Sequence, residues 1–281
     1  MTRRLATLTE VADRFDAIVL DQWGVLHDGT VAYSGAVACL QRLRATGSRL
    51  AVLSNSGKRA APNQDRISGM GFAADLFDAV MTSGEALWQD VAAGRVAETV
   101  LFAIERAPGD AAAWAEGLGV TFVDRPEDAQ AVLLMGLPDG AQHADFADDL
   151  DIARSQGIPV LCTNPDRASP RANGEIVLSP GALAHAYAEA GGTVRFYGKP
   201  HGPVFSALEA ALGVAPERLL MVGDSLEHDI AGGHAAGWST AFVEGGLHAG
   251  RFVGPDPDAA LVRLVAEQGT PSPDFTLSRL E

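Results

Sequence analysis

Short apolar runs recur along the chain, and each ends in glycine or in polar residues. The run at residues 18–20, for example, is followed at once by Asp21 and soon after by Gly24. Runs of this length bounded by turn residues predict buried strands. Between them, apolar side chains recur at helical spacing, as in residues 34–46, where Gly47 marks the end of the predicted helix. Strand and helix alternate, which predicts an α/β fold built on a parallel sheet.

The predicted elements near the two ends of the chain belong to one sheet. Its strands are expected at residues 18–20, 50–53, 77–82, 194–197, 219–222 and 239–243. Helices are expected at residues 34–46, 62–69, 203–212 and 231–237, with one more in the tail beyond Arg251. Because strands joined by helical crossovers pair in parallel, these elements predict a Rossmann-like core domain.

Between residues 85 and 192 the pattern starts again with its own strands and helices. Strands are expected at residues 100–104, 120–123, 131–135 and 159–163, and helices at 111–117, around 144–150 and from Pro180 onward. A segment of this length does not fit a loop within a compact domain. We therefore predict an inserted α/β cap domain over residues 85–192, which interrupts a discontinuous core domain formed by residues 1–84 and 193–281.

The composition narrows the classes of partner. The formal net charge of −15 disfavours nucleic acid and anionic membranes, because either partner needs a basic surface. No stretch approaches the roughly 18 apolar residues of a membrane span, so no membrane partner is expected. Cys39 and Cys162 are far apart in the sequence, so neither a disulfide framework nor a thiolate metal site is indicated. A cytoplasmic location is expected.

Two strand ends in the first part of the chain carry candidate chemistry. Asp21 lies at the edge where open α/β sheets bind ligands, so its carboxylate is a candidate nucleophile or metal ligand. An aspartate that only closes a strand-to-turn junction is the alternative. Ser54 and Asn55 follow the second strand. Hydroxyl, amide and backbone N–H groups at the start of a helix can bind phosphate, and the alternative is a polar turn with a capping serine.

Three later strand ends also carry polar side chains. Lys199 follows the strand expected at residues 194–197. Asp224 and Asp229 lie five residues apart across a strand-to-helix turn, where both can approach one cation, and oxygen ligands of this kind suit Mg²⁺. Asn164 and Asp166 follow a strand of the inserted domain. They are either substrate contacts or only parts of a turn.

These strand ends, in this order, resemble the motifs of the haloacid dehalogenase superfamily. The matching segments are Asp21 in its D-x-x-G-V-L context, Ser54–Asn55, Gly198–Lys199–Pro200 and residues 223–229. The chain also resembles one branch of that superfamily, the large-cap (class IIA) phosphatases of sugar phosphates, nucleotides and p-nitrophenyl phosphate. This second resemblance is carried by residues 164–166, residues 179–182 and the flap over residues 27–36.

The resemblance implies a hydrolase that acts on a small phosphorylated metabolite through an aspartyl-phosphate intermediate. Asp21 would attack phosphorus in line, while Ser54 and Lys199 would hold the phosphoryl oxygens. Such a reaction depends mainly on placement and on charge neutralisation. The other substrate contacts expected from the motifs are Asn55, Asn164 and Asp166.

The resemblance also implies a bound Mg²⁺ ion. Its ligands would be Asp21, Asp224, Asp229 and the backbone carbonyl of Trp23. The expected partner is the small phosphorylated metabolite itself, without nucleic acid or membrane. A homodimer formed through the cap is also considered.

Position 23 departs from the family's phosphatases, which carry there a second aspartate that protonates the leaving group and later activates water. Here it is Trp23, whose indole offers an N–H group but no titratable proton. General acid–base help is typically worth about 10²–10⁴ in rate. His27 and Asp28 are candidate replacements, and the alternative for Asp28 is that it only shapes the turn before Gly29.

Two other functions stay open because of Trp23. One is a dehalogenase-like hydrolase of carbon–halogen bonds, in which Asp21 attacks carbon and no alkoxide needs a proton. The other is a catalytically weak or inactive homologue that binds a phosphate ligand without turnover. The pair Asp224 and Asp229 argues against the first, because a metal-free displacement would not require these carboxylates.

Overall fold

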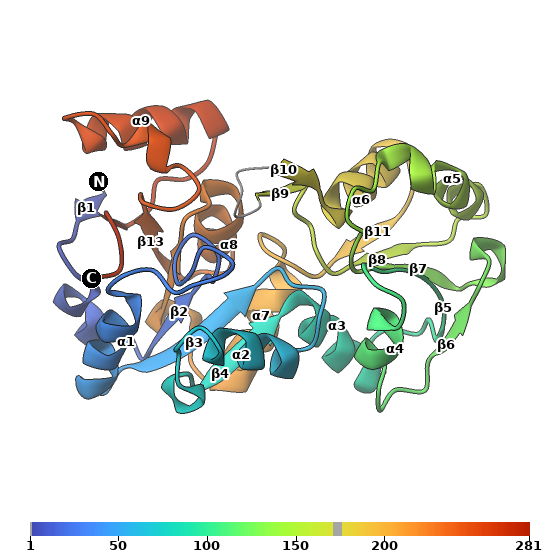
Figure 1. The fold of residues 1–281 in the computed structure, drawn as a ribbon, viewed down its shortest axis with the longest axis horizontal. Helices are drawn as coiled ribbons and strands as arrows, with labels where there is room; N and C mark the ends of the chain where they lie inside the picture. Colours follow the sequence, from blue (N-terminus) through green and yellow to red (C-terminus); the bar gives the residue numbers. More distant parts are fainter. Residues whose placement is uncertain (1, 171–175) are drawn as a thin grey trace. The chain divides into compact units, whose positions relative to one another are not determined.

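The computed structural model of the protein describes residues 2–170 and 176–281 (Figure 1). The chain divides into two compact units. The first comprises Met1–Ser54, Gln64–Met81 and Phe205–Glu281, and the second comprises Asn55–Asn63 and Thr82–Val204. The division into a core and a cap domain at residues 85 and 192 stays a prediction.

The first unit contains a sheet to which both ends of the chain contribute. Within the described residues seven strands form it, in the order β1-β14-β13-β12-β2-β3-β4. They are β1 (Arg3–Arg4), β2 (Ala17–Leu20), β3 (Arg49–Ser54), β4 (Ala79–Thr82), β12 (Leu219–Gly223), β13 (Ser239–Val243) and β14 (Phe275–Leu277). The pairings from β1 through β3 are parallel. The strand order places strands from the start of the chain beside strands from its end, so blue strands lie beside orange-red ones in Figure 1. This sheet confirms the predicted α/β fold.

The first unit also contains helices, some of which show the capping residues or the buried apolar face expected from the sequence. They are α1 (Ala36–Ala45), α2 (Ala60–Ser68), α7 (Gly202–Leu212), α8 (Ala231–Ala235) and α9 (Pro257–Gln268). Helix α1 buries Cys39, Leu40 and Leu43 along one face. Helix α9 is preceded by the capping residue Asp256, whose side chain accepts the backbone N–H of Ala259, and is followed by Gly269 in the left-handed conformation that glycine favours.

The second unit has a sheet of its own. Among the residues that the structure describes, five parallel strands form it in the order β11-β8-β7-β5-β6. They are β5 (Val100–Ile104), β6 (Thr121–Val123), β7 (Ala131–Leu134), β8 (Val160–Cys162) and β11 (Val194–Phe196). An antiparallel pair joins β9 (Ala168–Pro170) to β10 (Ile176–Leu178). The helices are α3 (Ser83–Ala92), α4 (Asp110–Trp114), α5 (Ala147–Ser155) and α6 (Pro180–Glu189).

Strand β11 corrects one expectation. The chain was expected to return to the first sheet at Val194, but β11 pairs in parallel with β8, with Val194 opposite Val160 and Phe196 opposite Cys162. The reason is that α6 connects β8 to β11 as a crossover, and strands joined in this way are usually neighbours. Its partly buried side chains pack on the core of the second unit.

Each unit has a separate apolar core. Side chains of the central strands β2 and β12, such as Ile18, Leu20, Leu220 and Val222, belong to the core of the first unit. The second core contains apolar side chains of β7, β8 and α6. Cys39 and Cys162 are buried with free thiols, one in each core. In the described part of the chain, no helix has both the length and the apolar character needed to cross a bilayer.

Candidate active site

Two neighbouring strands of the first unit bring carboxylates to one edge of the sheet. Strands β2 and β12 are parallel neighbours, with Leu20 opposite Val222. Asp21 extends this pairing by one residue, because its backbone N–H donates to the carbonyl oxygen of Val222 at 2.9 Å. Asp224 directly follows β12. The carboxyl ends of parallel strands point to the same edge, so the two aspartates meet there.

Asp229 joins these two aspartates in a cluster of three carboxylates. One oxygen from each of Asp21, Asp224 and Asp229 lies within 4.8 Å of the others. Asp224 and Asp229 are 4% and 1% exposed, and Asp21 is half-buried. Buried charges of one sign are costly unless a cation compensates them. Three converging carboxylates therefore fit a divalent cation that prefers oxygen ligands.

Backbone N–H groups hold two of these carboxylates in place. The N–H of Leu247 donates to Asp224 Oδ2 at 2.6 Å, and the N–H of Ser225 donates to Asp229 Oδ2 at 3.0 Å. The hydroxyl of Ser225 accepts the N–H of His228 at 3.1 Å and so caps the π-helical turn η7 (Leu226–Ile230). The carboxylates are thus oriented before any cation binds.

Three glycines allow the backbone to approach the cluster. A Cβ on Gly24, which has a φ of +81°, would lie 1.7 Å from Asp224 Oδ2. A Cβ on Gly246 would lie 2.2 Å from the same oxygen, and one on Gly223 would lie 2.1 Å from Asp229 Cγ. No side chain fits at these positions unless a carboxylate moves.

The chain turns sharply after Asp21 and places Trp23 in a short loop. The carbonyl oxygen of Gln22 accepts the N–H groups of Leu26 at 2.8 Å and His27 at 3.2 Å, while Gly24 N–H donates to the carbonyl of His27 at 3.0 Å. The indole of Trp23 lies beside Gly29, where an added Cβ would be 3.3 Å from the indole nitrogen. Trp23 is partly buried.

His27 is a buried, neutral side chain at ordinary pH. Burial, together with the charge of Arg66, lowers the pKa of His27 to about 4. Its Nδ1 atom accepts the backbone N–H of Gly29 at 3.0 Å. With so low a pKa, the ring does not carry the extra proton that a general acid at neutral pH would donate.

Asp28 makes the contacts of a turn-forming aspartate. Its Oδ1 atom accepts the N–H and the hydroxyl of Thr30 at 2.9 and 2.7 Å and the N–H of Val31 at 2.9 Å. These hydrogen bonds, first that from Val31, lower the pKa of Asp28 to about 2. The carboxyl group is ionised at neutral pH and has no proton to give.

The candidate phosphate-binding residues fall in both units. Ser54 ends β3 in the first unit, and Asn55 and Lys199 belong to the second. Lys199 is 2% exposed, and its backbone N–H donates to Asn55 Oδ1 at 2.6 Å. Asn55 also donates from Nδ2 to Asp166 Oδ1 at 2.7 Å. The structure therefore brings Asn55, Asp166 and Lys199 together.

Comparison with known proteins agrees with these motifs. A family model described as haloacid dehalogenase-like hydrolase matches residues 18–119, and a second, described as HAD-hydrolase-like, matches residues 196–265. The crystal structure of a haloacid dehalogenase-like hydrolase from Brucella suis 1330 is similar with a TM-score of 0.82 and 29% identity, covering 99% of this chain and 100% of that chain. This chain belongs to the haloacid dehalogenase-like hydrolases. It is an enzyme of the class IIA branch.

Two further proteins are similar over most of this chain. Chronophin from Rattus norvegicus is 28% identical over 250 residues, which cover 87% of this chain and 81% of chronophin. Glycerol phosphate phosphatase from Mycobacterium tuberculosis, solved in complex with calcium, is similar with a TM-score of 0.68 and 26% identity, covering 84% of this chain and 68% of that chain.

Sequence reasoning missed several residues that shape the site of this hydrolase. Gly246 follows strand β13, and the glycine pair at residues 245–246 was the available signal. Tyr33 was not singled out either. Burial, and then the charges of Asp224 and Asp28, raise the pKa of Tyr33 above its ordinary value.

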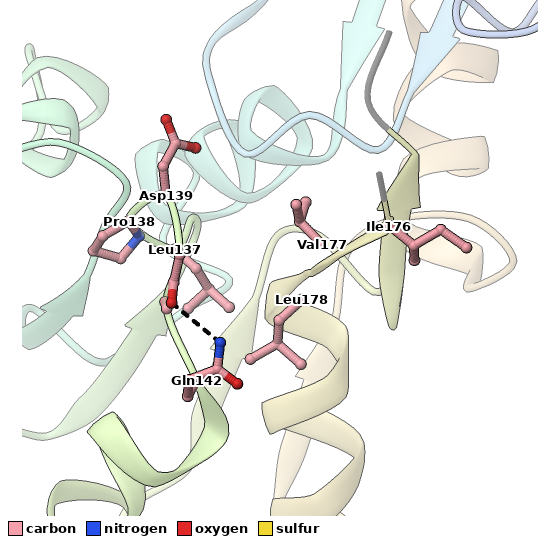
Figure 2. Close-up of a pocket in the computed structure, with 9 residues that line it drawn as sticks. Leu137, Pro138, Asp139, Gln142, Ile176, Val177 and Leu178 are labelled. Atoms are coloured by element: carbon pink, nitrogen blue, oxygen red, sulfur yellow. Dashed lines mark hydrogen bonds between the residues drawn. The ribbon is translucent and has the colours of Figure 1, made fainter. Parts of the chain in front are cut away.

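Cavities also occur among the described residues of the second unit, and two of them lie near polar side chains. Figure 2 shows one of about 200 Å³, lined by residues 137–142 and 176–178, in which Gln142 Nε2 donates to the carbonyl of Gly140 at 3.2 Å. Ile176 points away from the other lining side chains and is largely exposed. The other cavity, of about 170 Å³, is lined in part by Asn164 and Lys58. Lys58 pairs there with Asp110 at 2.9 Å.

Proposed function

We propose that this hydrolase cleaves a small phosphomonoester with the help of Mg²⁺ and through a phosphorylated Asp21. The observation that carries the proposal is the cluster of Asp21, Asp224 and Asp229 at the carboxyl edge of the first sheet. The family assignment supports it. The half-buried Asp21 is accessible to a substrate, as a nucleophile must be, and together with the buried Asp224 and Asp229 it can also bind a cation.

The three carboxylates fit Mg²⁺ because they supply hard oxygen ligands and are held by backbone N–H groups. Asp21, Asp224, Asp229 and the backbone carbonyl of Trp23 are the proposed ligands. When bound, the cation neutralises charge on the phosphoryl oxygens. The glycerol phosphate phosphatase of Mycobacterium tuberculosis, solved with calcium, supports a divalent cation in this family.

Asp21 carries the covalent chemistry. One of its carboxylate oxygens attacks phosphorus, the bond from phosphorus to the ester oxygen breaks, and the leaving oxygen departs as an anion that takes a proton from solvent. Water then attacks the phosphorus of the aspartyl phosphate, which releases inorganic phosphate and restores the carboxylate. Ser54 donates a hydrogen bond and Lys199 a positive charge to the phosphoryl oxygens, which offsets the repulsion between nucleophile and substrate.

Trp23 replaces the general acid, so the leaving oxygen departs with its charge largely unneutralised. The pKa values of His27 and Asp28 support this view, because neither group is an acid at neutral pH. The rate then depends strongly on leaving-group acidity. Aryl and acyl phosphates are the favoured substrates, and alkyl phosphates are poor ones.

The proposed substrate is a small phosphorylated metabolite. The name of the relative glycerol phosphate phosphatase supports a small phosphate ester as substrate, but glycerol phosphate is an alkyl ester and so does not support the preference for aryl and acyl leaving groups. The net charge of −15 argues against a nucleic-acid substrate. Two buried free thiols are in keeping with a reducing compartment, and we place the protein in the cytoplasm. A homodimer through the predicted cap domain, residues 85–192, is part of the same proposal.

The test is a panel of aryl, acyl and alkyl phosphates assayed with and without Mg²⁺, beside a haloacid control. We expect phosphate release that requires Mg²⁺ and falls from aryl to alkyl esters. Halide release without metal would favour the dehalogenase, and phosphate binding without turnover would favour an inactive homologue.

A further inference from the structure

The side chain of Asn55 forms a two-point contact with the backbone of Lys199. Asn55 Oδ1 accepts the N–H of Lys199 at 2.6 Å, and Asn55 Nδ2 donates to the carbonyl of Lys199 at 3.1 Å. The same Nδ2 group donates to Asp166 Oδ1 at 2.7 Å. All three residues belong to the second unit, and Asn55 and Lys199 are buried.

Asp166 reinforces the orientation of the Asn55 amide. An amide can rotate by half a turn and exchange its donor for its acceptor. In the exchanged orientation, Asn55 would present an NH₂ group to the Lys199 N–H and a carbonyl oxygen to both the Lys199 carbonyl and the Asp166 carboxylate. These contacts would be repulsive, and buried polar groups without partners are costly. The carboxylate of Asp166 therefore stabilises the orientation that the Lys199 backbone also favours.

The turn that carries Asp166 is itself fixed between two glycines. The N–H of Asp166 donates to Asn164 Oδ1 at 3.1 Å. A Cβ on Gly198 would lie 2.3 Å from Pro165 Cδ and 2.7 Å from Asn55 Oδ1, and one on Gly181 would lie 1.9 Å from the carbonyl oxygen of Pro165. The backbone of the turn thus packs directly against Gly181 and against the residue before Lys199.

We propose that Asn55 and Asp166 are positioning residues for Lys199: Asn55 holds the Lys199 backbone, and Asp166 stabilises the Asn55 amide in the orientation that does so. This role differs from the direct substrate contacts expected from the sequence. It rests on the proposed function, in which the Lys199 ammonium stabilises the phosphoryl group. Small displacements of a group that acts on the transition state reduce turnover more than binding.

The test compares Asp166→Ala, which removes the acceptor for the Asn55 amide, with Asn55→Asp, the exchanged pair Asn55→Asp/Asp166→Asn and wild type. Asp151→Ala is the matched control, because Asp151 is an exposed carboxylate of the same unit. Two quantities are measured: hydrogen exchange of the Lys199 amide, which needs no turnover, and kcat and KM for an aryl phosphate with Mg²⁺.

We expect each single variant to raise the exchange rate of the Lys199 amide about tenfold and to lower kcat about tenfold with little change in KM. The exchanged pair should recover part of both losses, since an amide at position 166 can donate to a carboxylate at position 55. Asp151→Ala should match wild type. Asn164→Ala, which removes only the acceptor for the Asp166 N–H, should act in the same direction but less strongly, and it serves if Asp166→Ala does not fold.

Unchanged Lys199 exchange in the folded Asp166→Ala variant would overturn the proposal. A higher KM without faster exchange would instead make Asp166 a substrate contact. An exchanged pair no better than the singles would also count against the orientation argument. A wild-type protein without turnover would refute the proposed function alone, because the exchange measurement still decides whether Asp166 and Asn55 hold Lys199.

Discussion

Substitution of Gly246 by alanine tests the metal site by displacing a ligand without changing its chemistry. An added Cβ would lie 2.2 Å from Asp224 Oδ2 and 2.5 Å from Asp224 Cβ. Gly246 does not have a positive φ, so alanine can adopt its backbone conformation without strain. Any change in Mg²⁺ binding therefore comes from the contact between the new Cβ and Asp224. The carboxylate of Asp224, which Leu247 holds at 2.6 Å, must then move.

The size of the displacement sets the expected effect. Ordinary contacts of a Cβ begin at 3.4 Å, so the Gly246 Cβ and the Asp224 oxygen must separate by about 1.2 Å. Functional constellations tolerate only about 0.5 Å. Disturbing the groups that orient a ligand typically costs about 10–100-fold in metal affinity. We expect the Mg²⁺ concentration for half-maximal activity to rise by a factor in that range.

The assay is phosphate release from an aryl phosphate over a wide range of Mg²⁺, with thermal unfolding measured with and without Mg²⁺. Gly250→Ala is the matched control, since an added Cβ at Gly250 meets nothing within 4 Å. It should reproduce the wild-type titration. A folded Gly246→Ala variant with an unchanged Mg²⁺ titration would refute the assignment of Asp224 as a ligand.

Three other predictions concern acid–base chemistry and stability. Trp23→Asp should raise kcat for an alkyl phosphate at least about tenfold while leaving an aryl phosphate little changed, and equal effects on both esters would refute the leaving-group argument. The pKa of His27 is about 4 in the folded protein and about 6.5 in the unfolded chain. The free energy of unfolding of wild type should therefore fall by about 3 kcal/mol as the pH is lowered from 6.5 to 4. In a His27→Asn variant, denaturant unfolding should show no such dependence of stability on pH. Arg4→Met should cost about 2 kcal/mol because it leaves Glu244 buried without its ion pair, whereas the exposed Arg3→Met should cost under about 1 kcal/mol; equal midpoints for the two variants would contradict this.

The sequence predicted the elements whose apolar pattern is strong. Strand β13 begins and ends at the expected residues, and α1 and α6 were placed closely, because buried strands and one-sided helices leave a clear spacing of apolar residues. Strands β1 and β14 were missed, since two or three residues give no period to detect. Strand β11 was placed in the wrong sheet because pairing partners depend on tertiary packing.

The sequence predicted those residues of the candidate site that come directly after a buried strand. Asp21 and Asp224 were identifiable because each directly follows a buried strand. The contact of Gly246 with Asp224 joins two loops, and no local pattern reports such an approach. The link between Asn55 and Asp166 likewise joins distant segments, 111 residues apart. The burial that lowers the pKa of His27 is also a tertiary effect.

The central claim is that Asp21 is phosphorylated during turnover. The most direct measurement is to quench the enzyme with acid while it turns over an aryl phosphate with Mg²⁺ and to locate the phosphoryl group by peptide mass spectrometry. We predict one added phosphoryl group on the peptide that contains Asp21, and neither this adduct nor phosphate release in a folded Asp21→Asn variant. Phosphate release by Asp21→Asn at the wild-type rate, or a phosphoryl group on another residue, would contradict the account.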